Sequence, residues 1–190
     1  LGGLHATILF EGSSAHSARP WEGENALHKA GNLLTRLSTM KPKRVTYSSL
    51  DYFEVLSATQ ANTANSRNSI PADFVLNLNY RFAPGKRISE AKEYVIDFVG
   101  NEGNVTFVDE CPSARVPIDN SVLESFQSLH DLAFEPKQAW TDIARLDLFG
   151  IPAVNCGPGT PSQAHQKNEW ILKQNLHQGM DYYQTFLFPR

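Results

Sequence analysis

The sequence predicts an α+β fold, a ferredoxin-like βαββαβ domain over residues 1–112, followed by an α/β block over residues 113–190. The first observation behind this prediction is the order of strand-like and helix-like patterns over the first 110 residues. The second is the pair of prolines within residues 112–117, after which the pattern changes. A chain of 190 residues and 21.2 kDa has room for one good-sized domain or two small ones.

The first half of the domain reads as strand, loop and helix. Residues 7–10 predict a strand that Gly12 closes, and a loop rich in His, Arg, Pro and Trp follows it. From Asn25 onward, apolar residues recur with helical spacing, and Pro42 ends the predicted helix. Within the loop, we expect Trp21 to serve in packing rather than in recognition.

The second half reads as two strands, a helix and a final strand. Residues 50–63 are rich in aromatic and β-branched side chains, and residues 74–82 alternate apolar and polar side chains with the period of a half-buried strand. Ser89 is the expected cap of a helix that Gly100 ends, and residues 105–108 predict the last strand.

The block after residue 112 predicts three helices and one short strand. Ser121 and Glu124 fit a capping box, residues 144–149 predict a second helix, and residues 151–155 predict a buried strand. A closing helix carries apolar residues on one face. A lone strand leaves its edges unpaired, so we expect this block to be part of a larger α/β layer, and the first residue, Leu1, agrees with an excised fragment.

Composition narrows the function classes. Seventeen Lys and Arg against twenty Asp and Glu give a net charge of −3 and a pI of about 6.1, with no basic block. We therefore expect a small-molecule or protein partner, and no nucleic acid. No stretch is long and apolar enough for a membrane span, so we also expect no membrane and a cytoplasmic location. Cys111 and Cys156 lack zinc-finger and redox spacing and are expected to be free thiols.

His165 is the candidate metal ligand. It follows the predicted strand and a Gly/Pro-rich loop, where open α/β sheets bind ligands, and neutral imidazole binds zinc. The alternative interpretation is a histidine on a surface loop. Zinc needs three or four ligands, and the sequence near His165 does not supply the others.

Three further residues suit polar recognition. His16, in an exposed loop beside Arg19, could polarise a carbonyl or could simply be a turn residue. Arg81 projects from the polar face of the clearest strand, where it could hold a carboxylate or be a solvated side chain. Asn68 could cap a turn or donate a hydrogen bond to an oxyanion.

Five collinear motifs resemble the co-catalytic zinc aminoacylase and carboxypeptidase family, in particular its succinyl-diaminopimelate desuccinylases. The motifs are G-x-x-x-H-S-A-R-P-W-x-G-x-N-A, R-N-x-I-P-A-D-F, L-N-Y-R-F-A-P, W-T-D-I-A-R and G-P-G-x-x-x-x-A-H-Q-x-x-E, at residues 12–26, 67–74, 78–84, 140–145 and 157–169. The resemblance implies that residues 1–112 are a dimerisation domain, or lid. It also implies that residues 113–190 are the final part of a zinc-peptidase-like catalytic domain whose first half lies outside this chain.

The resemblance also implies roles for individual residues. His165 matches the last of the zinc ligands, His16 a lid histidine that reaches the partner subunit's active site, and Asn68 a lid residue that contacts substrate. Arg81, Arg145 and Thr160 match positions that hold substrate carboxylates.

The implied activity is a zinc-dependent amide hydrolase. It would remove succinate from N-succinyl-L,L-diaminopimelate, with two zinc ions per full-length subunit and a homodimer formed through the lid. The alternatives are an N-acetylornithine deacetylase or another aminoacylase of the same family and, from a different class, a non-catalytic dimerisation module. By itself the chain is expected to bind zinc poorly and to be inactive.

Overall fold

The computed structural model describes residues 1–164 and 166–188, and these residues form two compact units. The first unit contains residues 1–115 and 135–150. The second contains residues 116–134 and the described residues from 151 onward. Residues 135–150 therefore lie with the predicted lid, while the functional division near residue 112 stays a prediction.

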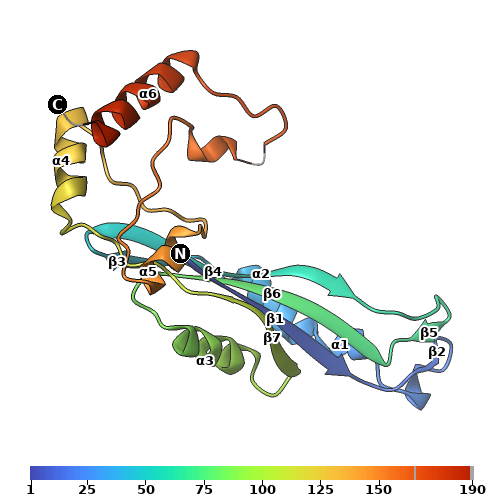
Figure 1. The fold of residues 1–190 in the computed structure, drawn as a ribbon. Coiled ribbons are helices and arrows are strands. Elements are labelled where there is room, and N and C mark those ends of the chain that lie inside the picture. The colour runs from blue at the N-terminus through green and yellow to red at the C-terminus, as the bar shows by residue number, and fades with distance from the viewer. Residues whose placement is uncertain (165, 189–190) are drawn as a thin grey trace. The chain divides into compact units, whose positions relative to one another are not determined.

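A five-stranded antiparallel sheet forms the centre of the first unit (Figure 1). Its strands, in spatial order, are β3 (Lys43–Tyr47), β4 (Leu50–Asn62), β6 (Asp73–Phe82), β1 (Gly2–Glu11) and β7 (Asn104–Cys111). The order β4-β6-β1-β7 is that of a ferredoxin-like sheet, which confirms the predicted fold. Strand β3 adds a hairpin that we did not predict, because its five residues include two charged ones.

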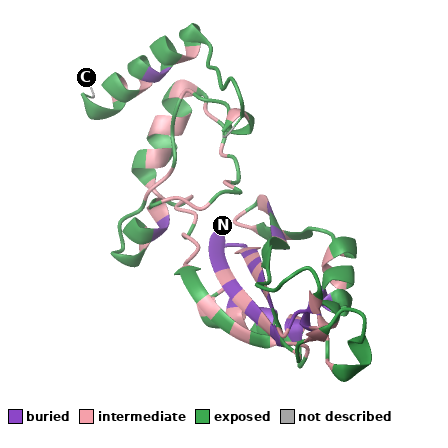
Figure 2. Ribbon diagram, turned by 90° about the vertical axis from the view of Figure 1, so that its right-hand side faces the viewer, coloured by how far each residue is buried: buried purple, intermediate pink, exposed green. Residues whose placement is uncertain are grey.

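One face of the sheet forms the core. Alternate side chains of β1 and β6 are buried, and they appear as purple bands along the strands in Figure 2. Helices α1 (Ala26–Lys29), α2 (Gly31–Thr39) and α3 (Ile88–Val99) cover this face. The residues that these helices bury in the core are Ala26, Leu33, Ala91, Val95 and Val99, together with Ala30 between α1 and α2.

The opposite face of β1 and β6 is polar. His5 on β1 hydrogen-bonds to the side chains of Asn77 and Asn79 on β6, and Arg81 continues the same row. The alternation in β6 predicted this division between an apolar and a polar face, and the structure confirms it.

The helix boundaries differ from the prediction in two places. The expected continuous helix from Asn25 is divided between α1 and α2, and the Asn25 side chain accepts hydrogen bonds from the first turn of α1. Helix α3 begins one residue before Ser89, and Arg87 is its cap residue. The backbone N–H of Arg87 donates to the Glu90 carboxylate at 2.8 Å, so this contact replaces the predicted Ser89 cap.

The second unit contains α4 (Ser121–His130) and α6 (Lys173–Leu187), while α5 (Ile143–Leu148) belongs to the first unit. All three predicted helices are confirmed, although Asn120, not Ser121, caps α4. The strand predicted over residues 151–155 is wrong. That segment has no strand partner among residues 1–164 and 166–188, and a strand needs a neighbour to satisfy its backbone hydrogen bonds.

No helix in the described part of the chain is both long and apolar enough to cross a membrane.

Candidate functional site

His16 and Asn68 meet at one end of the first unit. His16 ends β2 (Ala15–His16), which pairs antiparallel with β5 (Ser69–Ile70), and His16 faces Ser69 in this small sheet. The N–H of Ser17 donates to the backbone oxygen of Asn68 at 2.8 Å. The β2–β5 pair lies just beyond the carboxyl end of β1 and the amino end of β6 (Figure 1). Two predicted site residues that are 52 positions apart in the sequence, 68 − 16, are therefore neighbours at this tip.

The His16 ring has a defined hydrogen-bonding state. Its Nδ1 atom accepts a hydrogen bond from the N–H of Ala18 at 3.1 Å, within an exposed turn. When one ring nitrogen of a neutral imidazole accepts, the other carries the proton. The turn therefore leaves Nε2–H as a donor, which is the form that an oxyanion requires.

The loop that carries His16 is held by tight backbone contacts. Ser13 and Glu24 exchange two backbone hydrogen bonds, and a Cβ at Gly12 would lie 2.1 Å from the Glu24 oxygen. Next to β2, Trp21 lies on the 3₁₀ turn Pro20–Glu22 and is 77% exposed. Contrary to the prediction, Trp21 packs little against the other described residues, and its indole is exposed near His16.

Arg81 lies at the opposite end of the sheet. At about 3.3 Å per residue, β6 separates Arg81 from Asp73 at the His16 end by about 26 Å. Arg81 faces Gly3 on β1, and Gly3 faces Cys111 on β7. No carboxylate in the described residues forms an ion pair with Arg81.

Arg145 lies at the same end as Arg81. It is on α5, its guanidinium is 5.4 Å from the centre of the Trp140 ring, and its Nε is 3.6 Å from an oxygen of Asp142. Burial raises the pKa of the Cys111 thiol, as does the charge of Asp109, whereas the charges of Arg145 and Arg81 lower it. The charges of both arginines therefore act on the same thiol of β7.

The segment of Arg145 is tied to the sheet by side-chain hydrogen bonds. The Gln138 amide accepts from the N–H of Phe53 and donates to its carbonyl oxygen, both at 3.0 Å, as a neighbouring strand would. The Trp140 Nε1–H donates to the oxygen of Pro112 at 3.1 Å. Sequence reasoning missed Gln138 because nothing in its local pattern indicates a partner 85 residues away.

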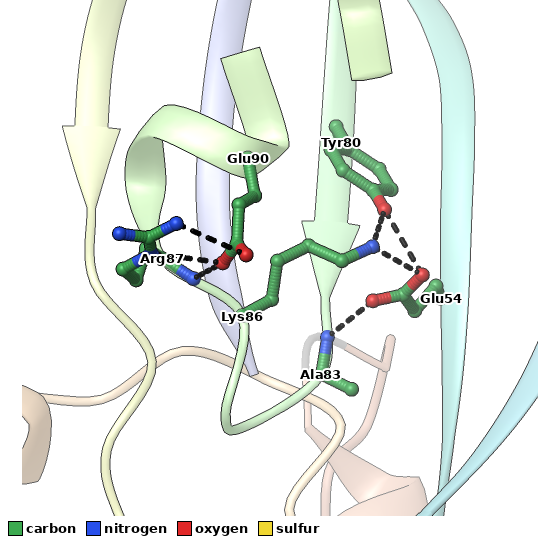
Figure 3. Close-up of polar contacts among 6 residues, drawn as sticks. All are labelled: Glu54, Tyr80, Ala83, Lys86, Arg87 and Glu90. Atoms are coloured by element: carbon green, nitrogen blue, oxygen red, sulfur yellow. Dashed lines mark hydrogen bonds and ion pairs between the residues drawn. The ribbon is translucent and has the colours of Figure 1, made fainter. Parts of the chain in front are cut away.

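A buried charge cluster lies where β6 turns into α3 (Figure 3). Glu54 on β4 is 5% exposed, and its carboxylate accepts from Lys86 Nζ at 2.7 Å, the Tyr80 hydroxyl at 3.0 Å and the N–H of Ala83 at 3.0 Å. Burial raises the pKa of Glu54, but these hydrogen bonds and the Lys86 charge outweigh burial, so its pKa lies below the usual range. Burial and the Glu54 charge raise the pKa of Tyr80.

This cluster borders a shallow depression of about 360 Å³. Lys86 is part of its lining, and the Lys86 ammonium also lies 5.2 Å from the centre of the Tyr80 ring. Glu54, Lys86 and Tyr80 are hydrogen-bonded to one another, so none of the three is a free catalytic group. The cluster instead fixes the turn after β6.

The remaining predicted residues belong to the second unit. Thr160 is exposed and precedes the 3₁₀ turn Pro161–Gln163. His165 lies outside the described residues. Among those that are described, no group of three or more His, Cys, Asp or Glu side chains could hold a metal ion. These residues therefore do not form a zinc site.

A comparison with models of known protein families shows to which family the chain belongs. Residues 1–106 match the family of peptidase dimerisation domains, M20_dimer. The chain belongs to the M20 peptidase family. This confirms the resemblance inferred from the five motifs, and the M20 dimerisation domain coincides with the ferredoxin-like sheet described above.

Relatives of the M20 chain include desuccinylases. It is 33% identical over 187 residues to a candidate succinyl-diaminopimelate desuccinylase, DapE, of Mycobacterium tuberculosis, and the match covers 98% of this chain and 53% of the relative. It is 32% identical over 173 residues to the succinyl-diaminopimelate desuccinylase of Corynebacterium glutamicum, covering 88% and 47%. The M20 chain thus spans about half the length of the curated relatives it matches.

Solved structures share the fold of the M20 chain. The metallo-carboxypeptidase Sso-CP2 of Sulfolobus solfataricus superimposes with a TM-score of 0.70 at 12% identity, covering 98% of this chain and 57% of that one. The dipeptidase Dug1p of Saccharomyces cerevisiae gives 0.66 at 13% identity, covering 98% and 53%. These relatives and structures bear the names of hydrolases of amide or peptide bonds.

Proposed function

We propose that this M20 chain is part of a zinc-dependent amide hydrolase that removes succinate from N-succinyl-L,L-diaminopimelate, in diaminopimelate and lysine biosynthesis in the cytoplasm. Identity of 32% to the C. glutamicum desuccinylase, together with the five motifs, supports this substrate. Residues 1–112 would be the lid, and residues 113–190 the final part of the catalytic domain.

The observation that carries the proposal is the division of the predicted site between two ends of one sheet. His16 and Asn68 lie at the tip, whereas Arg81 lies about 26 Å along β6 from the tip end of that strand, and Arg145 on α5 acts on the same thiol as Arg81. A diaminopimelate derivative is too short to span this separation within one lid. A single active site that uses both groups therefore requires the tip of one chain and the arginines of another, which supports a homodimer formed through the lid.

Each group would have a distinct chemical role. The Nε2–H of His16 would donate to the oxyanion that forms when hydroxide adds to the succinyl amide carbon, and the Asn68 amide would contact the substrate beside it. Arg81, Arg145 and Thr160 would hold the carboxylates of the substrate, since guanidinium groups bind carboxylates in a bidentate geometry.

His165 would be one zinc ligand, and the other ligands would come from the part of the catalytic domain outside this chain. When bound, zinc lowers the pKa of a water ligand toward neutrality. The described residues do not by themselves form such a site.

Two other functions stay open to test. An N-acetylornithine deacetylase or another aminoacylase of the family would use the same arrangement with a different acyl group, and probable fungal carboxypeptidases match this chain at 26% identity. A non-catalytic dimerisation module would use only the lid, where residues 1–106 match the dimerisation domain.

The deciding experiment compares acyl groups. A polypeptide that joins these residues to a complete catalytic domain should hydrolyse N-succinyl-L,L-diaminopimelate with a higher kcat/KM than N-acetylornithine. The reverse order would replace the desuccinylase by the deacetylase. Hydrolysis of neither substrate, in a zinc-loaded dimer, would favour the non-catalytic module.

A further inference from the structure

A row of three residues crosses the sheet beside the arginine pair, and its middle position has no side chain. Arg81 on β6, Gly3 on β1 and Cys111 on β7 are direct cross-strand partners. Residues that face one another across antiparallel strands project to the same side of the sheet. A side chain at position 3 would therefore stand between Arg81 and Cys111.

The Arg81 guanidinium fills the space that this missing side chain leaves. A Cβ placed on Gly3 would lie 2.7 Å from Arg81 Nη1, closer than such atoms approach one another, and in van der Waals contact with Arg81 Cζ at 3.5 Å. The same Cβ would be 3.9 Å from Cys111 Cβ. Arg81 thus extends over the backbone of β1 toward β7, and the glycine makes this path possible.

Backbone geometry does not explain glycine at this position. The glycines with positive φ are Gly85, Gly100 and Gly150 among those described, so position 3 has a conformation that alanine can adopt. The neighbouring Gly2 is different, because a Cβ there would lie 2.2 Å from the buried ring of Phe82. At Gly3 the close neighbour is the end of a flexible, charged side chain.

We propose that Gly3 is a positioning residue for Arg81. By carrying no side chain, it lets the guanidinium reach across β1 to the side where Arg145 lies, and there the two arginines share a carboxylate group of the ligand. The carboxylate part of this inference rests on the proposed function, whereas the placement of Arg81 by Gly3 does not.

Cys111 provides a reporter of the Arg81 position in the chain as it stands. Burial raises the pKa of the Cys111 thiol most, Asp109 raises it further through its charge and its hydrogen bond, and the charges of Arg145 and Arg81 lower it. In a Cys156→Ser background, the pH dependence of Cys111 alkylation by iodoacetamide measures this pKa. We expect Gly3→Ala to raise it, because the new methyl group displaces the Arg81 guanidinium from β1.

Gly31→Ala is the matched control. Gly31 begins α2, and a Cβ there would meet nothing within 4 Å. Gly31→Ala should therefore leave the Cys111 pKa unchanged. Equal Cys111 pKa values in the Gly3→Ala and Gly31→Ala chains would overturn the positioning role of Gly3 and leave the hydrolase proposal intact.

A double-mutant cycle separates displacement of Arg81 from added burial of the thiol. Arg81→Met should raise the Cys111 pKa by itself, and adding Gly3→Ala to Arg81→Met should raise it no further. An additive effect of the two substitutions would mean that the methyl group acts on Cys111 by burial alone, and the positioning role would be lost.

Binding of succinate tests the carboxylate part. In a titration followed by NMR, Gly3→Ala should weaken succinate binding roughly tenfold and Arg81→Met at least as much, as expected for loss of a charge-assisted hydrogen bond. Gly31→Ala should bind as the unmodified chain does. If the Arg81→Met chain bound succinate as the unmodified chain does, Arg81 would not bind the carboxylate, whatever the Cys111 pKa shows.

Discussion

Replacing Glu54 by alanine removes the acceptor at the centre of the buried charge cluster. Glu54 receives three hydrogen bonds, from Lys86, Tyr80 and the backbone of Ala83. The substitution leaves the Lys86 ammonium without its counter-ion and the N–H of Ala83 without its acceptor. The side chain of Lys86 is only 23% exposed, so water replaces the lost partner poorly.

The size of the effect follows from this geometry. Removal of one partner from a buried ion pair costs about 3–5 kcal/mol of unfolding free energy. Partial exposure of Lys86 places the expected loss near the lower limit, at about 3 kcal/mol. Glu54→Gln keeps the shape and one acceptor oxygen, so we expect a smaller loss than for alanine.

Urea unfolding of the 190-residue chain, followed by circular dichroism, measures this loss. Glu22→Ala is the control, because the Arg19–Glu22 pair is exposed, with 3.8 Å between its charged atoms, and should contribute less than about 1 kcal/mol. A Glu54→Ala chain as stable as the Glu22→Ala chain would show that the cluster does not stabilise the fold.

The same cluster predicts a pH dependence. The pKa of Glu54 is lower in the folded chain than in the unfolded chain, so the folded state favours the ionised carboxylate. Its contribution is complete above the unfolded pKa of about 4.3 and is lost as the pH falls through the folded pKa. The stability difference between the unmodified and Glu54→Gln chains should therefore be largest near neutral pH and shrink below about pH 4.

Three other predictions concern the site. In a polypeptide with a complete catalytic domain, His16→Ala should lower kcat roughly 10²-fold with zinc content unchanged, and an unaltered kcat would exclude His16 as the oxyanion donor. After dialysis, metal analysis of the present chain should find less than one zinc per chain, because His165 is a single ligand; two tightly bound zinc ions would refute this. Gln138→Ala should speed hydrogen exchange at the Phe53 amide, whereas Gln60→Ala on the same strand should not.

The central elements of the fold could be predicted from local patterns. The alternation of β6 and the helical spacing in α3 depend only on which face of an element is buried. Such periodicity is a local property that can be recognised from residues close together in the sequence. The β3 hairpin escaped prediction because its segment is short, begins with two charged residues and has no fully buried side chain.

The strand expected over residues 151–155 shows the limit of this reasoning. Its apolar residues satisfy the pattern of a buried strand, yet Ile151 is 50% exposed and the segment has no strand beside it in the described residues. Pairing is a property of two segments, and a pattern within one segment cannot supply the second.

The amino-acid sequence by itself determined which residues suit oxyanion and carboxylate recognition, since His16, Asn68, Arg81 and Arg145 all lie in motifs that resemble the M20 enzymes. Only the tertiary structure decided that these residues lie at opposite ends of one sheet, and that Gly3 leaves room for Arg81. The physical reason is register, because which residues face one another across β1, β6 and β7 depends on hydrogen bonds between strands far apart in the chain.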